Sequence, residues 1–532
     1  MYRFIKKALS CLLIAVLVLG AIAPFTDYEV NAASKVTQIY GNTRFDTSIK
    51  VANELKKELG LSKFDAVILT RGNYYADAFS ASGLSAELKA PILLVDPNLE
   101  SDFGKKIFTN VVNYIERNLA PKGKIYILGG TSAVPVNYEN AYSPAKEYEI
   151  LRFGGETFYD TNIEILNETD RLHAEKNLGA YDKELIVCKG GNYPDALAAG
   201  SLGRPMLLVR DTGLSEEQKA YLAGRGTSNI TIIGGPSAVS ESILEELKAY
   251  GSVDRHFGST KFDTPVALAR KLYGNKPKEV MLITGDNYPD GLCAGPLAYV
   301  KKCPILLVGK KYIAPAYNYQ INAGKPSVTI IGGSNVINKN AAASGTAFKK
   351  GWNKYWNDYI YINSNGAVST AKINDTGFQV TANAGGIVTS SNKSDMERKI
   401  DSCSYGTAIV IHLEQQKMDY VRNNKLILTT DVVTGQLRSP TPTGTYWINN
   451  KARNTVLTGI SLSGNPYEVP VEYWMAFKGS EYGIHDSYYT KKYGGTIYKY
   501  NGSLGCVRTP LGAMAKLYSM VAVGTKVVIK KK

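Results

Sequence analysis

A histidine and a cysteine near the C-terminus are the residues whose types could perform covalent chemistry together. The chain reads YGIHDSYYTKKYGGTIYKYNGSLGCVRTP over residues 482–510, so Cys506 follows His485, one of only four histidines in 532 residues, by 21 positions. A thiolate is the reactive form of cysteine, and a nearby histidine can accept the thiol proton to give an ion pair at neutral pH. The two residues predict nucleophilic catalysis if the fold brings them together.

The residues around Cys506 suit the same task. Gly505 would let a substrate approach closely and would leave backbone N–H groups near Cys506 free to form an oxyanion hole. Arg508 supplies a positive charge that would favour a thiolate or hold a substrate carboxylate. Spacing alone still favours the plainer interpretation, because an isolated cysteine and histidine in a β domain are more often packing residues.

The wider pattern resembles the L,D-transpeptidase catalytic domain. The motif of that family runs from a histidine through a variable loop to S-x-G-C-[IV]-R, and here it corresponds to His485, Ser503, Gly505, Cys506, Val507 and Arg508. The upstream segments QQKMDYVRNNKL, TPTGTYWI and MAFKGSEYGIH match the same family. The resemblance covers residues 407–531 and implies a compact, mainly β domain.

The resemblance implies acyl transfer on peptidoglycan stem peptides. Cys506 would attack the carbonyl between the third and fourth residues of a tetrapeptide stem, expel D-alanine and form a thioester. An amine from the third residue of a neighbouring stem would then displace the sulfur and give a 3→3 cross-link. His485 would act as general base and then as general acid, and Ser503, Gly505 and Arg508 would support the substrate or the oxyanion. Carbapenems are the implied covalent inhibitors, and no cofactor is implied.

Two positions depart from the family pattern, and no metal site is predicted. Many members have histidine in the position of Leu504 and glycine in that of Asp486. Asp486 could orient His485 or could simply form a turn. The four histidines are scattered, without an H-x-x-x-H or C-x-x-C pair, so metal chemistry is not expected.

The elements that must position these residues are predicted to be strands. From Thr407 the chain reads AIVIHLEQQKMDYVRNNKLILTTDVVTG, which indicates two strands with a turn at Asn423 and Asn424. Residues 348–406 are rich in Trp, Tyr, Asn, Ser and Gly, and this composition fits a flexible linker and a small β segment equally well.

Three copies of one unit precede this region. Each copy has an aromatic-Asp-Thr step, a Gly-containing turn with Asn-Tyr and Asp, a small-residue helix, an apolar strand such as PILLV, and a last strand that ends in a glycine pair. Apolar strands that alternate with helices predict a parallel sheet covered on both faces. We expect helix N-caps at two sets of recurring residues, which are Thr47, Thr161 and Thr264, and Asp77, Asp195 and Asp290.

The three copies resemble the clostridial type-2 cell-wall-binding repeat over residues 36–347. The resemblance implies three Rossmann-like modules around a pseudo-threefold axis, which bind an anionic secondary polymer of a Gram-positive wall without covalent attachment. The expected module boundaries are 36–148, 149–250 and 251–347. The first copy departs from the others, because Ala76 stands where they have Pro194 and Pro289.

The N-terminus and the charge indicate where the protein works. Residues 1–32 have a basic start, an apolar run and small residues before Ala32, which predicts a cleaved signal peptide and secretion to the cell wall; an uncut membrane anchor is the alternative. The net charge of +15 comes with no signature of nucleic-acid binding. An anionic wall polymer or a membrane surface is the favoured class of partner, and a merely basic solvated surface is the alternative.

Three functions remain open at this point. The first is a wall-anchored L,D-transpeptidase. The second is an L,D-carboxypeptidase or endopeptidase that uses the same cysteine with water as the acceptor. The third is a surface-layer or adhesin protein whose last domain only binds peptidoglycan, and the intact set of motif residues counts against it.

Overall fold

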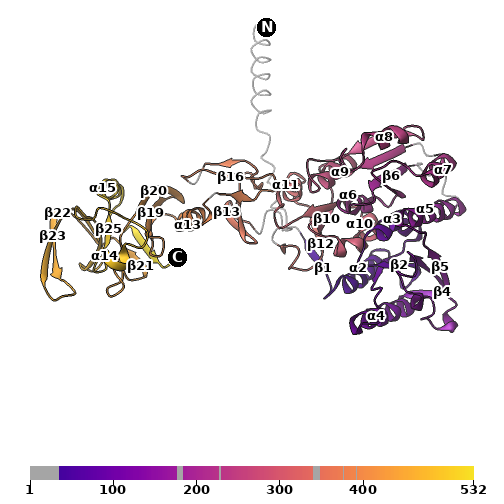
Figure 1. The fold of residues 1–532 in the computed structure, drawn as a ribbon, viewed down its shortest axis with the longest axis horizontal. Helices are drawn as coiled ribbons and strands as arrows, with labels where there is room; N and C mark the ends of the chain where they lie inside the picture. The colour runs from indigo at the N-terminus through magenta and orange to yellow at the C-terminus, as the bar shows by residue number, and fades with distance from the viewer. Residues whose placement is uncertain (1–34, 177–183, 227–228, 340–347, 375–376, 391) are drawn as a thin grey trace, which may run out of the picture. The chain divides into compact units, whose positions relative to one another are not determined.

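The computed structural model describes residues 35–176, 184–226, 229–339, 348–374, 377–390 and 392–532. The predicted signal peptide, residues 1–32, lies outside the described residues. The chain divides into two compact units, one of residues up to 310 together with 315–348, and one of residues 311–314 together with 349–532 (Figure 1). Within the described residues, none of the helices combines the length and the apolar character needed to cross a membrane.

Three α/β modules form the first unit, and each is built on a four-stranded parallel sheet. The first sheet has the order β3 (Ile92–Val95), β2 (Phe64–Arg71), β4 (Leu119–Leu128) and β5 (Glu149–Phe153). The second has the order β7 (Met206–Val209), β6 (Glu184–Lys189), β8 (Asn229–Ile233) and β9 (Ser252–His256). The third has the order β11 (Ile305–Val308), β10 (Glu279–Thr284), β12 (Ser327–Ile331) and β1 (Val36–Ile39).

Helices accompany these strands, as the alternating pattern predicted. In the first copy they are α2 (Arg44–Glu58), α3 (Ala76–Leu88) and α4 (Asp102–Asn118). In the second they are α5 (Phe158–Glu175), α6 (Pro194–Ala199), α7 (Glu216–Arg225) and α8 (Glu241–Leu247). In the third they are α9 (Asp263–Tyr273), α10 (Ala294–Val300) and α11 (Ala314–Asn322). The apolar ILLV and MLLV strands are buried throughout, which fits sheets covered on both faces.

Each sheet takes its fourth strand from the start of the next copy. β5, at the start of the second copy, pairs with β4 of the first, and β9, at the start of the third, pairs with β8 of the second. β1 completes the cycle, because it pairs with β12 of the third copy from Val36↔Val328 onward. The expected boundaries at residues 149 and 251 therefore fall just before strands that belong to the preceding sheet.

Three tyrosines meet where the copies converge. The rings of Tyr75, Tyr193 and Tyr288, one from each Asn-Tyr or Tyr-Tyr turn, have centroid separations of 5.2, 5.5 and 6.1 Å. The Tyr193 hydroxyl donates to the Gly285 carbonyl at 3.1 Å, and the Tyr288 hydroxyl donates to the Asn73 carbonyl at 2.9 Å. These contacts between copies agree with the expected arrangement about a pseudo-threefold axis.

The expected helix caps are not the residues that form them. Thr43 and Thr157 are the N-caps of α2 and α5, whereas Thr47 and Thr161 lie inside these helices. Their hydroxyls, like that of Thr264, accept a hydrogen bond from the N–H of a preceding glycine, at 3.0, 3.0 and 3.1 Å. A threonine four residues upstream that offers its hydroxyl to a first-turn N–H makes the better cap, because its backbone is extended rather than helical.

The recurring aspartates do not cap helices either. The N-caps of α3 and α6 are Tyr75 and Tyr193, without a side-chain cap bond. Burial raises the pKa of Asp77 and of Asp195 to about 6. A Cβ atom at Gly129 would lie 3.1 Å from the Asp77 carboxylate, and its φ of +112° already favours glycine. The recurring glycine pairs therefore make room for these buried carboxyl groups.

The second unit is mainly β. Its five-stranded sheet has the order β20 (Lys425–Asp431), β19 (Lys417–Arg422), β18 (Ala408–His412), β26 (Lys526–Lys530) and β21 (Gly444–Trp447). Its four-stranded sheet has the order β22 (Asn450–Ile460), β23 (Pro466–Lys478), β24 (Tyr482–Asp486) and β25 (Val507–Thr509). The helix α14 (Tyr498–Asn501) lies between β24 and β25 in the chain, and α15 (Leu511–Met520) follows β25. The predicted turn at Asn423 and Asn424 is present, with φ of 53° and 62°.

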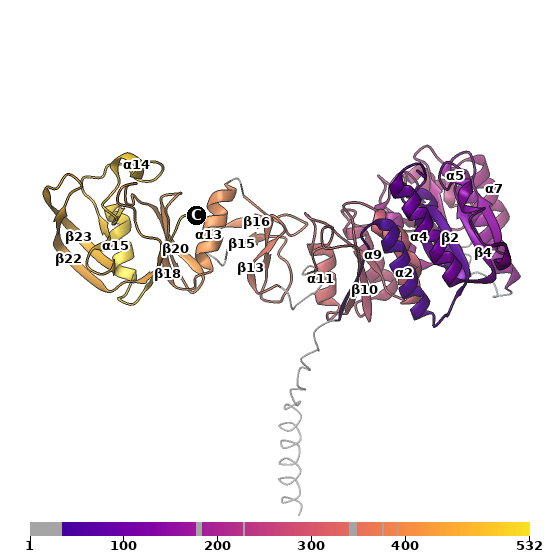
Figure 2. The ribbon, with the colours of Figure 1, turned by 90° about the horizontal axis from the view of Figure 1, so that it is seen from below.

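The described residues between 351 and 403 form short strands and one helix. The strands are β13 (Gly351–Tyr355), β14 (Asp358–Ile362), β15 (Lys372–Ile373), β16 (Val380–Ala382) and β17 (Val388–Thr389). The helix α13 (Lys393–Cys403) lies against β19 and β20 (Figure 2). This helix was not expected from the sequence.

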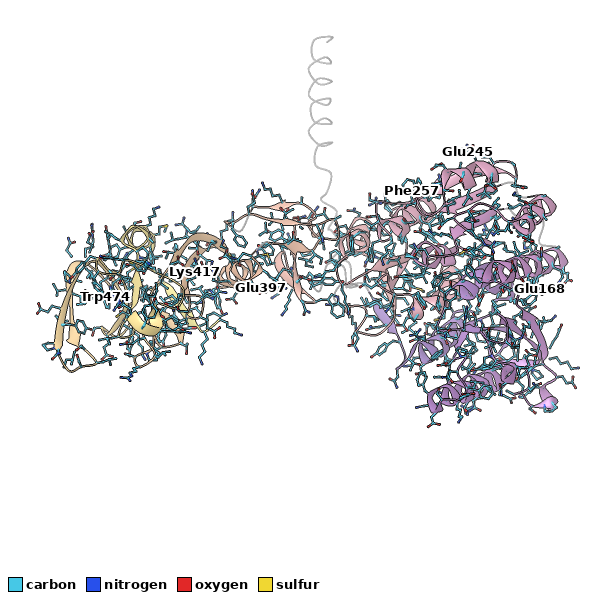
Figure 3. All side chains as sticks on the ribbon, in the orientation of Figure 1. Glu168, Glu245, Phe257, Glu397, Lys417 and Trp474 are labelled. Carbon is cyan, nitrogen blue, oxygen red and sulfur yellow. The ribbon has the colours of Figure 1, made fainter. Side chains whose placement is uncertain are left out.

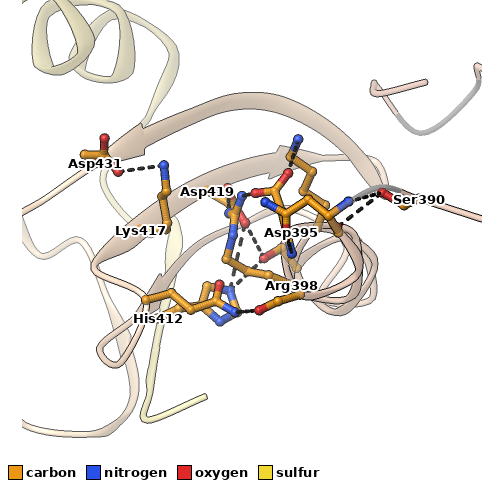
Figure 4. A network of polar contacts seen from close by, with 12 residues as sticks. Ser390, Asp395, Arg398, His412, Lys417, Asp419 and Asp431 are labelled. Carbon is orange, nitrogen blue, oxygen red and sulfur yellow. Dashed lines mark hydrogen bonds and ion pairs between the residues drawn. The ribbon is translucent and has the colours of Figure 1, made fainter. Parts of the chain in front are cut away.

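Buried polar contacts attach α13 to the sheet (Figure 4). Arg398 forms ion pairs with Asp395 and with the fully buried Asp419. The Ser402 hydroxyl donates to Asp419 at 2.7 Å and lies 2.9 Å from Nε2 of His412. Because unpaired charges are costly inside a protein, this network makes α13 an integral part of the unit.

Candidate active site

Two adjacent parallel strands bring His485 and Cys506 into one region. β24 and β25 pair from Ile484↔Val507 through His485↔Arg508. Cys506 directly precedes β25, and the loop between the strands holds α14. Both residues line a groove of about 660 Å³, so the structure brings the two predicted residues to the same cavity.

His485 is buried and has one ring nitrogen committed. Its side chain is 3% exposed, and Nδ1 lies 2.6 Å from the carbonyl oxygen of Asp486. A carbonyl only accepts, so Nδ1 carries the proton and Nε2 is the acceptor of the neutral ring. Burial lowers the pKa of His485 to about 4, with Arg508 acting in the same direction. The imidazole is therefore neutral at physiological pH, with a nitrogen available to receive a proton.

The side chain of Asp486 does not orient the imidazole. Its carboxylate accepts hydrogen bonds from the backbone N–H groups of Tyr473 at 2.7 Å and Glu472 at 3.2 Å. The contact to His485 comes instead from the backbone carbonyl of Asp486. Asp486 thus ties β24 to β23, and its backbone rather than its carboxylate sets the histidine tautomer.

Cys506 is half-buried and is held as a thiol. Its Sγ–H donates to the backbone carbonyl of Glu481 at 3.5 Å. Burial raises the pKa of the Cys506 thiol, while a backbone hydrogen bond at Gly483 and the charge of Arg508 oppose the rise. With the pKa of His485 lowered and that of Cys506 raised, the free protein favours a neutral thiol and a neutral imidazole that line the same groove. The ion pair expected from the sequence is not the resting state that these shifts favour.

Gly505 and Ser503 shape the turn before Cys506. Gly505 has φ of +118°, and a Cβ atom there would lie 2.5 Å from the ring of Tyr482, so only glycine fits. Its N–H donates to the Ser503 hydroxyl at 3.0 Å, and that hydroxyl donates to the carbonyl of Cys506. The Gly505 N–H is therefore not free for an oxyanion, contrary to expectation. The N–H of Cys506 itself has no hydrogen-bond partner among the described residues.

Arg508 is tied to the same loop. Its guanidinium donates to the carbonyls of Asn501 and Gly502, each at 3.2 Å, and its Cζ lies 5.0 Å from the ring centroid of Tyr489. Because these contacts hold the guanidinium, Arg508 acts on Cys506 through its charge and through the loop that it stabilises.

The groove also contains residues that the motif did not reveal. Trp474 on β23, labelled in Figure 3, is the sheet partner of His485, and the two rings have centroids 5.9 Å apart. The β22–β23 hairpin forms one wall, from which Tyr467 and Val469 line the groove. Tyr489 and Glu481 also line it. The sequence signal that could have found Trp474 is the antiparallel hairpin of β23 and β24, because this pairing places residues of β23 beside His485.

Other reactive residue types lie in different settings. Cys188, Cys293, Cys303 and Cys403 are buried cysteines. Burial raises the pKa of Cys188, Cys293 and Cys303. In the described part of the chain, no group of His, Cys, Asp and Glu side chains could hold a metal ion.

Comparisons with known families agree with this architecture. Residues 406–529 match the L,D-transpeptidase catalytic domain. Residues 38–139, 152–244 and 255–342 match cell wall binding domain 2, which together make up more than half of the chain. The chain is thereby placed among cell-wall-associated proteins, and its last domain in a family of wall transpeptidases and peptidases.

Individual relatives match the two parts separately. The N-acetylmuramoyl-L-alanine amidase LytC of Bacillus subtilis is 26% identical over 280 residues, which are 52% of this chain and 51% of that protein. The structure of Cwp6 from Clostridium difficile is 21% identical, covers 58% of this chain and 48% of that one, and has a TM-score of 0.50, which supports the fold alone. The catalytic domain of the Enterococcus faecium L,D-transpeptidase is 42% identical over 23% of this chain and 96% of that domain, with a TM-score of 0.23.

The chain spans 51% of the length of the first curated relative that it matches and 35% of the length of the second. The matches to the two family models, by contrast, follow the observed units in order along the sequence. The chain therefore belongs to the cell wall binding domain 2 family, with three copies of that domain followed by an L,D-transpeptidase catalytic domain.

Proposed function

We propose that this protein is a wall-anchored L,D-transpeptidase that forms 3→3 cross-links in peptidoglycan. The observation that carries the proposal is the shared groove of His485 and Cys506, in which His485 has Nδ1 bonded to a carbonyl and Nε2 left as its acceptor. A cysteine nucleophile with a neutral base beside it is the arrangement that acyl transfer needs.

In the acylation step, the thiol loses its proton to Nε2 of His485 as sulfur attacks the carbonyl carbon between the third and fourth stem residues. The negative charge that develops on the carbonyl oxygen is met by the backbone N–H of Cys506. His485 then gives its proton to the nitrogen of the departing D-alanine, the C–N bond breaks, and a thioester remains on Cys506. The neutral resting pair suits this order, because proton transfer and attack occur together once the substrate excludes water.

In the second step, the side-chain amine of the third residue of a neighbouring stem attacks the thioester carbonyl. His485 accepts a proton from this amine, the C–S bond breaks, and the proton returns to the sulfur of Cys506. Water in place of the amine would give a tripeptide instead. The proposal assigns Ser503, Gly505 and Arg508 to the turn that holds Cys506 and its N–H in place.

The three repeats supply the anchor in this proposal. Strands shared between neighbouring copies close the three modules into a ring, and the relatives similar to this chain include the N-acetylmuramoyl-L-alanine amidase LytC. We assign them to non-covalent attachment to an anionic secondary wall polymer, and the predicted signal peptide of residues 1–32 to export.

Muropeptide analysis tests the catalytic part of the proposal. Purified protein is incubated with disaccharide-tetrapeptide, and the products are separated and identified by mass. A 3→3 dimer with free D-alanine is expected. A tripeptide without dimer would make the protein a carboxypeptidase, and an unchanged substrate would leave only a binding role.

A further inference from the structure

The excess positive charge is concentrated in residues 349–532, which form the second unit apart from residues 311–314. Residues 349–532 contain 23 Lys and Arg against 12 Asp and Glu, a net charge of +11, whereas residues 35–348 contain 36 against 33, a net charge of +3. The repeats, to which wall attachment is assigned, are thus nearly neutral. Electrostatic attraction to an anionic polymer must therefore come mainly from the unit that contains the catalytic domain.

A groove in this unit gathers part of that charge. It has a volume of about 620 Å³ and lies between the β13–β14 hairpin, the end of α13 and the β19–β20 turn. We call it the lysine groove; the residues that define it are Lys349, Lys350, Lys425, Trp352, Tyr359 and Asn423. The His485 and Cys506 groove shares none of its lining residues.

The ammonium groups of the three lysines are available to bind an anionic ligand. Each is exposed, and none forms an ion pair with a carboxylate among the described residues. Asp401 is the one carboxylate among the described residues that line the groove, and it is neutralised by Lys530, with Nζ 2.8 Å from its carboxylate oxygen. Among the described residues, no neighbouring carboxylate balances the charge of these lysines, so the groove presents a net positive charge.

The remaining lining suits a sugar ring. Trp352 packs edge-on against Tyr361 with centroids 5.0 Å apart and parallel to Phe378 at 6.0 Å, so its indole is fixed. Trp352 and Tyr359 offer apolar ring surface, on which the C–H face of a pyranose can pack. The indole N–H is a buried donor with no acceptor among the described residues.

The opposite edge of the groove is rigid. Backbone N–H groups of Asn423 and Asn424 donate to the Thr407 hydroxyl at 3.1 Å and the Gly406 carbonyl at 2.9 Å. The side-chain amide of Asn424 donates to the Cys403 carbonyl at 2.8 Å. The turn is therefore fixed to the end of α13, and Asn423 keeps an exposed amide at the groove.

We infer that the lysine groove is a second wall-binding site, which holds an anionic saccharide segment of the secondary wall polymer. Its three ammonium groups would meet phosphate or carboxylate groups of the polymer, and Trp352 and Tyr359 would pack against a sugar ring. The inference takes the location at the wall from the proposed function, but it does not depend on the chemistry of Cys506 or on ligand binding by the repeats.

Binding of the full-length protein to purified walls tests the inference. The test variant is Lys349→Ser/Lys350→Ser/Lys425→Ser. The matched control is Lys354→Ser/Lys372→Ser/Lys516→Ser, which removes the same charge from exposed positions of the same unit outside the groove. Dissociation constants are measured by sedimentation at about 0.1 M and about 1 M salt, where the Debye length is roughly 10 and 3 Å.

We expect the groove variant to bind intact walls about tenfold to a hundredfold more weakly at the lower salt, since each lysine beside an anionic surface contributes roughly fivefold to affinity. The difference should shrink at the higher salt, and the control variant should bind nearly as the parent does. On walls stripped of the secondary polymer by acid, the groove variant and the parent should bind alike.

Three results would overturn the inference: equal binding by the groove variant and the parent on intact walls, an equal loss in the control variant, or a difference that persists on stripped walls. The last would point to the peptidoglycan itself as the ligand. Muropeptide products from soluble substrate report separately on the proposed catalysis, so either idea can fail while the other stands.

Discussion

His485 and His412 are both buried, and burial lowers the pKa of each to about 4, yet their surroundings make them different groups. Nδ1 of His485 is bonded to a carbonyl, which leaves Nε2 as an acceptor beside a groove. Nε2 of His412 faces the Ser402 hydroxyl, whose proton is already donated to Asp419.

The hydrogen bonds among Ser402, His412 and Asp419 run in the opposite direction to those of a catalytic triad. Because the Asp419 carboxylate takes the serine proton, His412 can only donate to Ser402 and cannot activate it. The three residue types of a hydrolase triad are thus present at Ser402, His412 and Asp419 without its chemistry. The ring nitrogen that is bonded, and its partner, separate the proposed catalytic histidine, His485, from the structural one, His412.

Removal of the proposed nucleophile should have the largest effect. Cys506→Ala should abolish carbapenem acylation and dimer formation, because among the described residues no other thiol lines a groove together with a histidine acceptor nitrogen. Intact-mass and peptide mass spectrometry measure the adduct. Cys403→Ala is the matched control and should acylate as the parent does; an adduct at any cysteine other than Cys506 would contradict the assignment.

Removal of the proposed base should have the next largest effect. His485→Ala should slow acylation by roughly 10²- to 10⁴-fold, the usual value of general-base assistance. His412→Ala should leave the acylation rate of folded protein within about threefold of the parent. Stopped-flow acylation followed by absorbance compares them. If His412→Ala slowed acylation as strongly, the distinction between the two histidines would fail.

The pH profile of acylation should report the neutral pair. As pH falls through about 4, His485 becomes protonated and loses its acceptor, so the rate should drop about tenfold for each further pH unit. Above pH 5 the rate should be flat until the Cys506 thiol ionises. This ionisation should occur at a higher pH than for an ordinary cysteine, because burial raises the pKa of Cys506. An ion pair would instead lose rate as His485 deprotonates near neutral pH, and a bell centred there would overturn the neutral assignment.

The Arg398 network should affect stability without affecting chemistry. Arg398→Leu leaves the buried Asp419 without its partner and should lower the free energy of unfolding by about 3–5 kcal/mol. The double variant Arg398→Leu/Asp419→Leu should recover much of this loss, since it removes both charges. Urea unfolding provides the measurement. A loss of acylation rate at unchanged stability would show that the network acts on the site.

The smallest effect is expected at Asp486. Asp486→Asn keeps the backbone carbonyl that bonds Nδ1 of His485, so acylation should stay within about fivefold of the parent. The free energy of unfolding should fall by about 1–3 kcal/mol. The side-chain NH₂ of asparagine would face one of the two backbone N–H groups that donate hydrogen bonds to the carboxylate of Asp486. A hundredfold loss of rate would instead mean that the carboxylate assists His485 directly.

The sequence was sufficient for residues that lie within one motif or one repeat. His485, Ser503, Gly505, Cys506 and Arg508 are short-range neighbours on two strands and one turn, so their types and order predicted their convergence. The alternation of apolar strands and helices likewise predicted three parallel sheets.

What the sequence did not reveal depends on distant contacts. Trp474 and Tyr467 reach the groove only because β22, β23 and β24 pair, and the pKa directions at the site follow from the burial that this packing creates. The exchange of β5, β9 and β1 between copies could not be seen in the repeats, because strands of similar sequence can pair within a copy or between copies. The helix α13 had a visible signal in Met396, Ile400 and Cys403, which recur at helical spacing.

The exchange of strands has a consequence for how the first unit folds. β1 and its partner β12 are about 290 residues apart in the chain, and this pairing belongs to the slowest class of contacts to form because a very long loop must close first. Until it forms, β12 presents an open edge on which another chain could pair. We therefore expect the last step of maturation to be ring closure, and a chain that lacks β1 to be prone to pair the open edge of β12 with a second copy.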